Sequence, residues 1–253
     1  MTGGAPSDSA ASSDTPLKTN LMETLSSVKA GPCGDEIYCM VTHQHLPRHV
    51  VTGEHLLPRA WNTLNKTLFG FADIDDVRNG VLMLGVIARA YARFQLCLIP
   101  QLVPPLSYAI VVHVLDPNLR NKTLVSALPQ EYGECCPSNA ADDAQLTALL
   151  TTRLGGTTFG DLHGTKVTAD PDRQTDYPSD PLLGPYARVL YWQTLRCMCE
   201  ARQKRWPAEF LPQLDIASIA PGYAERVNVW QACSHRVSGA VASDAAGSDE
   251  VSD

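Results

Sequence analysis

The sequence lacks a long apolar run, a basic excess and a Cys-x-x-Cys pair. Its most apolar segments are interrupted by Arg, Gln or Pro well before the roughly 20 residues that a membrane-spanning helix needs. We therefore expect no membrane segment. The opening stretch MTGGAPSDSAASSDTP has neither a basic start nor an apolar core, so we also expect no secretory signal and an intracellular location, in nucleus or cytoplasm.

Cysteine spacing and charge narrow the class of protein further. Eight cysteines in such a chain are most simply reduced thiols that pack as small apolar side chains. His43, His45 and His49 lie close together in the sequence, but the missing Cys-x-x-Cys pair argues against zinc. The net charge is −7, yet residues 238–253 alone hold four acidic and no basic side chains. The nearly neutral body neither demands nor excludes nucleic acid, because binding depends on a local basic face.

Composition divides the chain into two tails and two blocks. Residues 1–20 and 238–253 are rich in Ser, Ala, Asp and Gly, which predicts disordered tails. Turn-forming residues after position 133 separate a first block, residues 21–130, from a second, residues 131–237. The second block is expected to be a mainly helical extension packed on the first.

Several segments have the periodicity of a strand or a helix. Apolar and β-branched runs predict strands over 36–42, 50–57 and 107–115, the last in a hairpin with CLIPQL. Helical spacing predicts helices over 143–154 and 185–206, and a third within 81–96 whose opening reads as a strand or a helix entry. The mixture predicts an α+β fold.

The stretch VVTGEHLLP, residues 50–58, carries the strongest chemical signal. It places Glu54 and His55 together at the end of a β-branched run. An imidazole is a suitable general base near neutral pH, and carboxylate oxygen is a ligand that Mg²⁺ or Mn²⁺ accepts. A solvated pair at a strand end is the simpler reading of the dipeptide alone. Asn79, in DIDDVRNG, likewise fits an ordinary turn as well as a functional role.

Taken together, the words CMVT (39–42), GEHLLP (53–58) and DDVRNGVLML (75–84) resemble the HNH endonuclease family, its fungal and oomycete members in particular. The resemblance covers about residues 36–99 and implies a ββα-metal core. It implies that His55 is the general base and that Glu54 is a ligand of Mg²⁺ or Mn²⁺. Asn79 would pin the loop and orient the His55 ring. The implied reaction is hydrolysis of phosphodiester bonds in nucleic acid, with DNA as the expected partner.

The helix of the third motif departs from the family. Positions that carry His and often Asp in that family are Ala88 and Ala92 here. Alanine can neither ligate a metal nor hold a proton, so Glu54 is left alone as a protein ligand. Two hypotheses follow: an HNH-type endonuclease with an impaired site, or a catalytically inactive protein that binds nucleic acid or protein on the same scaffold. Basic residues such as Arg89 and Arg93 fit phosphate contacts or an ordinary solvated helix face.

Overall fold

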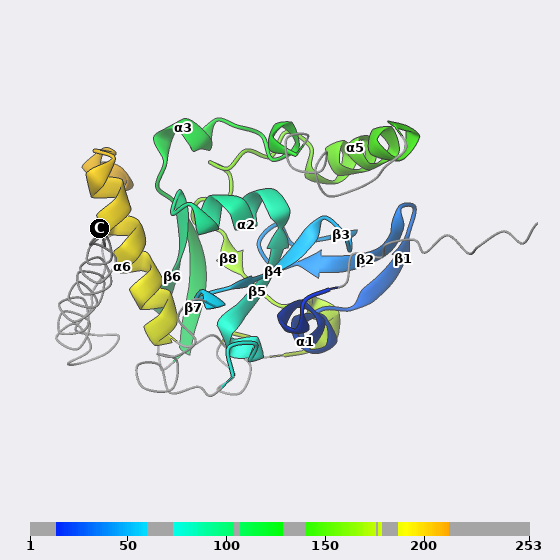
Figure 1. The fold of residues 1–253 in the computed structure, drawn as a ribbon, viewed down its shortest axis with the longest axis horizontal. Helices are drawn as coiled ribbons and strands as arrows, with labels where there is room; N and C mark the ends of the chain where they lie inside the picture. Colours follow the sequence, from blue (N-terminus) through cyan, green and yellow to red (C-terminus); the bar gives the residue numbers. More distant parts are fainter. Residues whose placement is uncertain are drawn as a thin grey trace, which may run out of the picture. The chain divides into compact units, whose positions relative to one another are not determined.

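The structure is a computed structural model, and it describes residues 14–59, 73–103, 107–128, 140–175, 177–178 and 187–212. All of these residues belong to one compact unit, residues 1–212. Helices alternate along the chain with three small antiparallel sheets (Figure 1). The protein is therefore α+β, as the sequence predicts.

The first sheet consists of β1 (Val28–Gly31), β2 (Gly34–Cys39) and β3 (Gln44–Pro47), with β2 in the centre. The strand expected over 36–42 is wrong in its last residues, which form a turn. His43 in this turn has a φ of 58°, a left-handed conformation that interrupts a strand. The stretch Gln44–Pro47 that follows the turn pairs with β2 as strand β3, which the sequence pattern does not predict.

The second sheet is a two-stranded ribbon of β4 (Val51–His55) and β5 (Gly80–Leu84). Helix α2 (Gly85–Ala92) follows β5 directly. The strands expected over 36–42 and 50–57 belong to different sheets, and β4 pairs instead with β5, which forms the opening of the segment 81–96. Helix α2 ends well before residue 96, because Phe94 has a φ of 59° and strand β6 begins at Leu96.

Helix α1 (Pro16–Leu25) packs against the β4–β5 ribbon through two glycines. A Cβ at Gly53 would lie 2.8 Å from the Cα of Lys18, and one at Gly80 would lie 2.7 Å from Cδ1 of Leu21. Only glycine lets this helix approach so closely. Leu17 is fully buried, so the expected disordered tail is wrong for residues 14–20. The rest of that tail, and the expected tail over 238–253, lie outside the described residues.

The third sheet joins the two blocks of the sequence. Its strands are β6 (Leu96–Val103), β7 (Ser107–Val114) and β8 (Lys166–Val167), and the β6–β7 hairpin confirms the sequence prediction. Helices α5 (Ala140–Leu154) and α6 (Ala187–Gln203) confirm the two helices expected in the second block. Helix α6 lies alongside β6 in Figure 1, and Thr194 Oγ1 donates to the Leu98 carbonyl at 3.4 Å.

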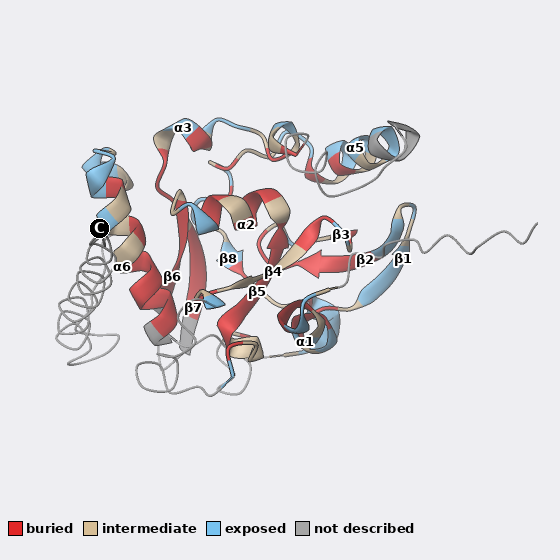
Figure 2. Cartoon of the chain, in the orientation of Figure 1, coloured by how far each residue is buried: buried red, intermediate tan, exposed pale blue. Residues whose placement is uncertain are grey.

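Short helical segments connect these elements. They are α3 (Pro117–Arg120), η3 (Val77–Asn79), η4 (Val125–Ala127), η5 (Pro171–Arg173) and η6 (Ala208–Phe210). Figure 2 shows buried residues concentrated in β5, β6, much of α2 and the N-terminal half of α6. Within the ranges that the structure describes, no helix combines the length and apolar character needed to cross a membrane.

Candidate functional site

The β4–β5 ribbon brings the end of one strand to the start of the next. His55, the last residue of β4, is paired in register with Gly80, the first residue of β5. The backbone N–H of Leu56 donates to the carbonyl of Asn79 at 2.8 Å, which extends the ribbon by one bond. Residues 73–79, including η3, are therefore held against the exit of β4.

Asn79 fastens this loop. Its side chain is fully buried, and its Oδ1 accepts from the backbone N–H of Leu57 at 2.8 Å. Its Nδ2 donates to the carbonyls of Ile74, at 2.8 Å, and Leu57, at 3.3 Å. A buried amide with both ends satisfied rigidifies its surroundings. These bonds tie the loop to the end of β4. None of them contacts the His55 ring, which the sequence resemblance expects Asn79 to orient.

The His55 ring instead meets Asp75. Its Nε2 lies 2.8 Å from Oδ1 of Asp75, with 14% of the His55 side chain and 17% of the Asp75 side chain exposed. A guanidinium nitrogen of Arg59 donates to both Asp75 oxygens, at 2.9 and 2.8 Å. The result is a chain of charge-assisted bonds from His55 through Asp75 to an Arg59 side chain that is 54% exposed.

The pKa shifts in this chain have identifiable causes. Burial lowers the pKa of His55 below its ordinary value and outweighs the opposite effect of Asp75. Burial works to raise the pKa of Asp75, but hydrogen bonds and charges from Arg59 and His55 lower it overall. At neutral pH the imidazole is therefore predominantly neutral and the carboxylate ionised, which is the state that a general base requires.

Glu54 has a different environment from that of its neighbour. Successive strand residues point to opposite faces of a sheet, so Glu54 and His55 face different sides. Glu54 lies near Tyr91 of α2. The pKa of Tyr91 is raised mainly by burial, then by Cys197, and also by the charge of Glu54. Among the residues that the structure describes, the Glu54 carboxylate makes no hydrogen bond or ion pair. Burial raises its pKa to about 7. This carboxylate lacks the partners that sheltered charges normally have.

Helix α2 adds no polar ligand beside this carboxylate. Ala88 is only 5% exposed, and Ala92, one turn later, is exposed. No group of three or more His, Cys, Asp or Glu side chains in the described ranges is placed to hold a metal ion. Mg²⁺ commonly keeps several waters and uses one or two carboxylates together with substrate phosphates. Glu54 fits that partial role, whereas the residues do not fit a metal held by protein alone.

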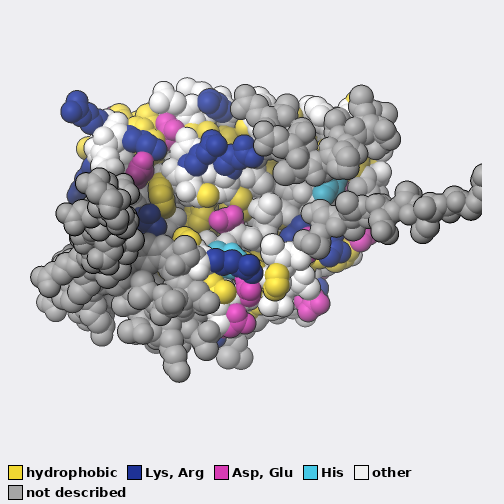
Figure 3. Space-filling model, in the orientation of Figure 1, with side chains coloured by type: hydrophobic (Ala, Val, Ile, Leu, Met, Phe, Trp, Pro, Cys, Tyr) yellow, Lys and Arg dark blue, Asp and Glu magenta, His cyan; other side chains and the backbone are white. Residues whose placement is uncertain are grey.

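Basic side chains lie on and after α2 and just beyond the end of β4. Arg59 and Arg93 are exposed, and Arg89 is partly exposed on α2. Figure 3 shows Lys and Arg side chains over α2, and below them a His side chain among basic and acidic ones. Arg196 is directed to aromatic rings, because its guanidinium lies 4.7 Å from the ring centre of Phe94 and 5.0 Å from that of Trp192. Its stacked position reduces its reach toward a phosphate.

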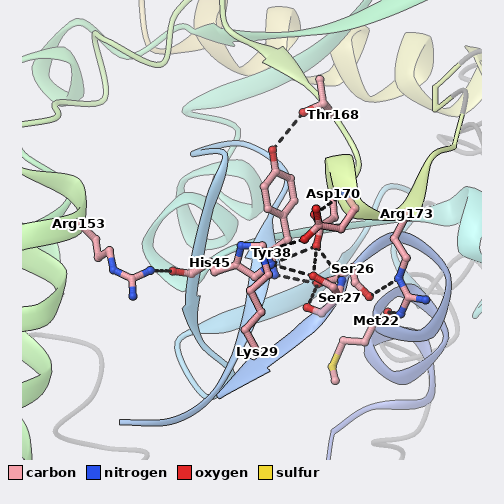
Figure 4. Close-up of polar contacts among 11 residues, drawn as sticks. Met22, Ser26, Ser27, Lys29, Tyr38, His45, Arg153, Thr168, Asp170 and Arg173 are labelled. Atoms are coloured by element: carbon pink, nitrogen blue, oxygen red, sulfur yellow. Dashed lines mark hydrogen bonds and ion pairs between the residues drawn. The ribbon is translucent and has the colours of Figure 1, made fainter. Parts of the chain in front are cut away.

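The histidines considered for zinc take separate roles. His43 contacts the carbonyl of Lys166 at 2.7 Å through Nε2. His45 contacts Ser27 and Asp170, and Figure 4 shows these three side chains meeting beside Tyr38. His49 instead lines a surface pocket of about 260 Å³ with Cys33 and three charged residues: Asp14, Asp35 and Arg48.

The Ser27, His45 and Asp170 side chains do not form a catalytic triad. Ser27 Oγ lies 3.0 Å and Asp170 Oδ2 lies 3.1 Å from the same ring nitrogen, Nε2 of His45. A triad needs the base to bond the nucleophile through one nitrogen and the orienting acid through the other. Asp170 also accepts from the backbone N–H groups of Ser27 and Asp172, so it fastens its segment to the first sheet.

A scan against protein-family models and searches of curated proteins and solved structures found no match for this chain. Asp75 and Arg59 are the residues that sequence reasoning missed. Asp75 sits in an acidic turn cluster whose composition indicates a loop, and only the pairing of β4 with β5 brings it to His55.

Proposed function

We propose that this protein is a metal-dependent endonuclease of the HNH type, with His55 as its general base. The observation that supports the proposal is the β4–β5–α2 unit, in which two paired strands are followed by a helix, the order of elements that the resemblance leads us to expect. His55 closes the first strand, and Asn79 ties the intervening loop to it. The resemblance names the same two residues, His55 as the base and Asn79 as the residue that pins the loop.

The carboxylate of Glu54, which has no hydrogen-bond or ion-pair partner among the described residues, supports a cation at this site. Glu54 would hold Mg²⁺ or Mn²⁺ through carboxylate oxygen, with the remaining ligands from water and a substrate phosphate. Such a metal supplies neutralisation of charge on the phosphate and on the leaving oxygen. If the substrate phosphate and water supplied the remaining ligands, an alanine at position 88 would be compatible with a cation held by Glu54. DNA is the expected substrate.

The protein's own side chains carry the proton and position the backbone of the nucleic acid. The neutral His55 imidazole accepts a proton from the attacking water as its oxygen forms the new bond to phosphorus. The bond from phosphorus to the leaving sugar oxygen breaks, and that oxygen takes a proton from solvent. The exposed Arg59 and Arg93 contact neighbouring phosphates, which makes binding sensitive to salt.

A second candidate function is nucleic-acid or protein binding on a catalytically inactive scaffold. The observation that favours it is the burial of Ala88, since α2 presents no second ligand to the Glu54 side of the ribbon. This function predicts no cleavage at any metal concentration. It also predicts that His55→Ala leaves binding of labelled DNA unchanged.

Nicking of supercoiled plasmid separates the two functions. Purified protein is incubated with plasmid across a series of Mg²⁺ and Mn²⁺ concentrations and in EDTA, with His55→Ala alongside. Metal-dependent nicking that is lost in the variant supports the enzyme. Absence of nicking by a folded protein, judged by circular dichroism, contradicts it for this chain. The variant pair Ala88→His and Ala92→Asp then tests whether restored polar groups produce activity.

A further inference from the structure

We propose that Asp75 is a positioning residue that fixes His55 as its Nε2–H tautomer, leaving Nδ1 as the nitrogen that accepts the proton. The inference deepens the proposed function, on which it rests, because it names the atom of the general base and the group that holds it. The sequence reading gave the orientation of this ring to Asn79. The structure assigns the direct contact to Asp75 and leaves Asn79 to act through the loop.

The bond between Nε2 and Oδ1 fixes the tautomer through the chemistry of its acceptor. An ionised carboxylate can only accept, so the ring nitrogen 2.8 Å away must carry the hydrogen. A neutral imidazole carries a single N–H, and the other nitrogen keeps its lone pair. Both side chains are less than one-fifth exposed, at 14% and 17%, so water competes poorly for the bond.

Asp75 is itself held in place from several directions. Arg59 bonds both of its carboxylate oxygens. Its backbone N–H donates to Oδ1 of Asp73 at 2.9 Å, and its carbonyl accepts from the Asn20 amide of α1 at 3.2 Å. The Asn79 amide holds the carbonyl of the preceding residue, Ile74, at 2.8 Å. With these anchors, Asp75 imposes its position on His55 rather than following the ring.

Position 76 provides a matched control on the same loop. Asp76 pairs with Arg78, at 2.6 Å between Oδ2 and a guanidinium nitrogen, and its Oδ1 accepts from the Arg78 backbone N–H at 2.9 Å. Both neighbouring acids are therefore ionised partners of an arginine, but only Asp75 contacts His55 among the described residues. Asp76→Ala thus removes an ion-paired carboxylate from the loop without removing the contact with the His55 ring, whereas Asp75→Ala removes both.

The tautomer gives Asp75 a defined effect on the reaction. When Nδ1 accepts the proton from water, the carboxylate on the opposite nitrogen stabilises the resulting imidazolium. Without Asp75 the ring divides between two tautomers and is free to turn. We expect Asp75→Ala to lower kcat of plasmid nicking about 10- to 100-fold, the usual range for partners that orient a functional histidine, with KM nearly unchanged.

Nitrogen NMR of the whole chain tests the tautomer directly. Protein labelled with ¹⁵N-histidine is recorded at pH about 8, above the ordinary histidine pKa of about 6.5, and His55→Gln identifies the signals. The expected wild-type spectrum shows a protonated Nε2 and an unprotonated Nδ1. In Asp75→Ala the two nitrogen shifts converge toward those of a mixture. Asp75→Asn restores the wild-type pattern through its amide oxygen, and Asp76→Ala leaves that pattern unchanged.

The inference is overturned by a wild-type spectrum with the proton on Nδ1, which requires no variant to fold. It is also overturned if the spectrum of folded Asp75→Ala matches that of the wild type. Because the spectrum does not depend on cleavage, its outcome and that of the plasmid assay are independent. Absence of nicking by the wild type contradicts the proposed function. A wild-type His55 with its proton on Nδ1 contradicts only the role of Asp75.

Discussion

Two histidine–aspartate pairs in this molecule look alike and have opposite surroundings. His45 Nε2 lies 3.1 Å from Asp170, and His55 Nε2 lies 2.8 Å from Asp75. The side chain of Asp170 is 1% exposed and also accepts bonds from Ser27 and Asp172, whereas Asp75 contacts an arginine that reaches into solvent. The same pair of residue types therefore stabilises the fold in one region and forms a candidate general base in the other.

The glutamates near the two pairs also differ in whether they have an ion-pair partner. Glu36, on β2 within the first sheet, is paired with Arg153 of α5 at 3.1 Å. Glu54, beside His55, has no such partner among the described residues, and burial raises its pKa to about 7. A protein satisfies its structural charges and leaves polar groups unsatisfied where a ligand completes them. The partners of a residue, rather than its type, therefore distinguish the two regions.

The largest expected effect concerns these two glutamates. Burial raises the pKa of folded Glu54 from 4.5 to about 7. Ionisation of Glu54 therefore destabilises the fold increasingly as the pH rises from 4.5 to about 7, and this destabilisation is complete above pH about 7. Glu54→Gln should raise the free energy of unfolding by up to about 3 kcal/mol at pH about 8 and by nothing below pH about 4. Urea denaturation at both pH values checks this.

Glu36→Gln is the matched variant for that experiment. It removes the charge partner of Arg153 from a buried bond, so we expect a loss of about 1–2 kcal/mol instead of a gain. Opposite signs for the two variants at alkaline pH sharpen the comparison. Equal losses at both positions would show that Glu54 is a satisfied structural charge.

The next effect concerns the two aspartates. Asp170→Ala leaves the N–H of Ser27 and the capped N–H of Asp172 without their acceptor, and we expect it to cost about 2–3 kcal/mol of stability. Asp75→Ala removes the acceptor of the His55 ring as well as a pair with an exposed arginine, and we expect it to cost less, about 1–2 kcal/mol, because the freed ring can turn toward solvent. Chemical denaturation of both variants measures the difference, and a larger loss at Asp75 would break the comparison.

The smallest expected effect is stabilisation by metal. At pH about 8, Mg²⁺ at ten times its Kd should add about 1.4 kcal/mol to the stability of the wild type. For a chain of this size, each kcal/mol of added stability raises Tm by about 2–4 °C. Glu54→Gln should show no rise and Glu36→Gln the full one. A shift retained in Glu54→Gln would place the cation elsewhere.

Long periodic segments were predictable from sequence, and short ones were not. The β6–β7 hairpin and helices α5 and α6 have runs long enough to define their period. Strand β5 runs without a break into α2, so its apolar residues read equally as a helix entry. Strand β3 contains two polar residues and a proline, and its pairing with β2 is a tertiary effect.

The candidate site was predictable as residue types but not as contacts. Glu54, His55 and Asn79 stand out in the sequence through their spacing and neighbours. The contact of His55 with Asp75 depends on the register of β4 with β5, which joins residues 20 positions apart. Nothing in the sequence indicates why Gly53 and Gly80 are glycines, and the close approach of α1 explains both.

The most direct test of the account compares the two histidines under single-turnover conditions. His55→Ala and His45→Ala are each incubated in excess over supercoiled plasmid with Mg²⁺, and nicking rates are divided by the folded fraction. The account predicts a loss of about 10²- to 10⁴-fold for His55→Ala, the range for a general base, and a near wild-type rate for His45→Ala. Equal rates for the two variants, or a loss confined to His45→Ala, would contradict it.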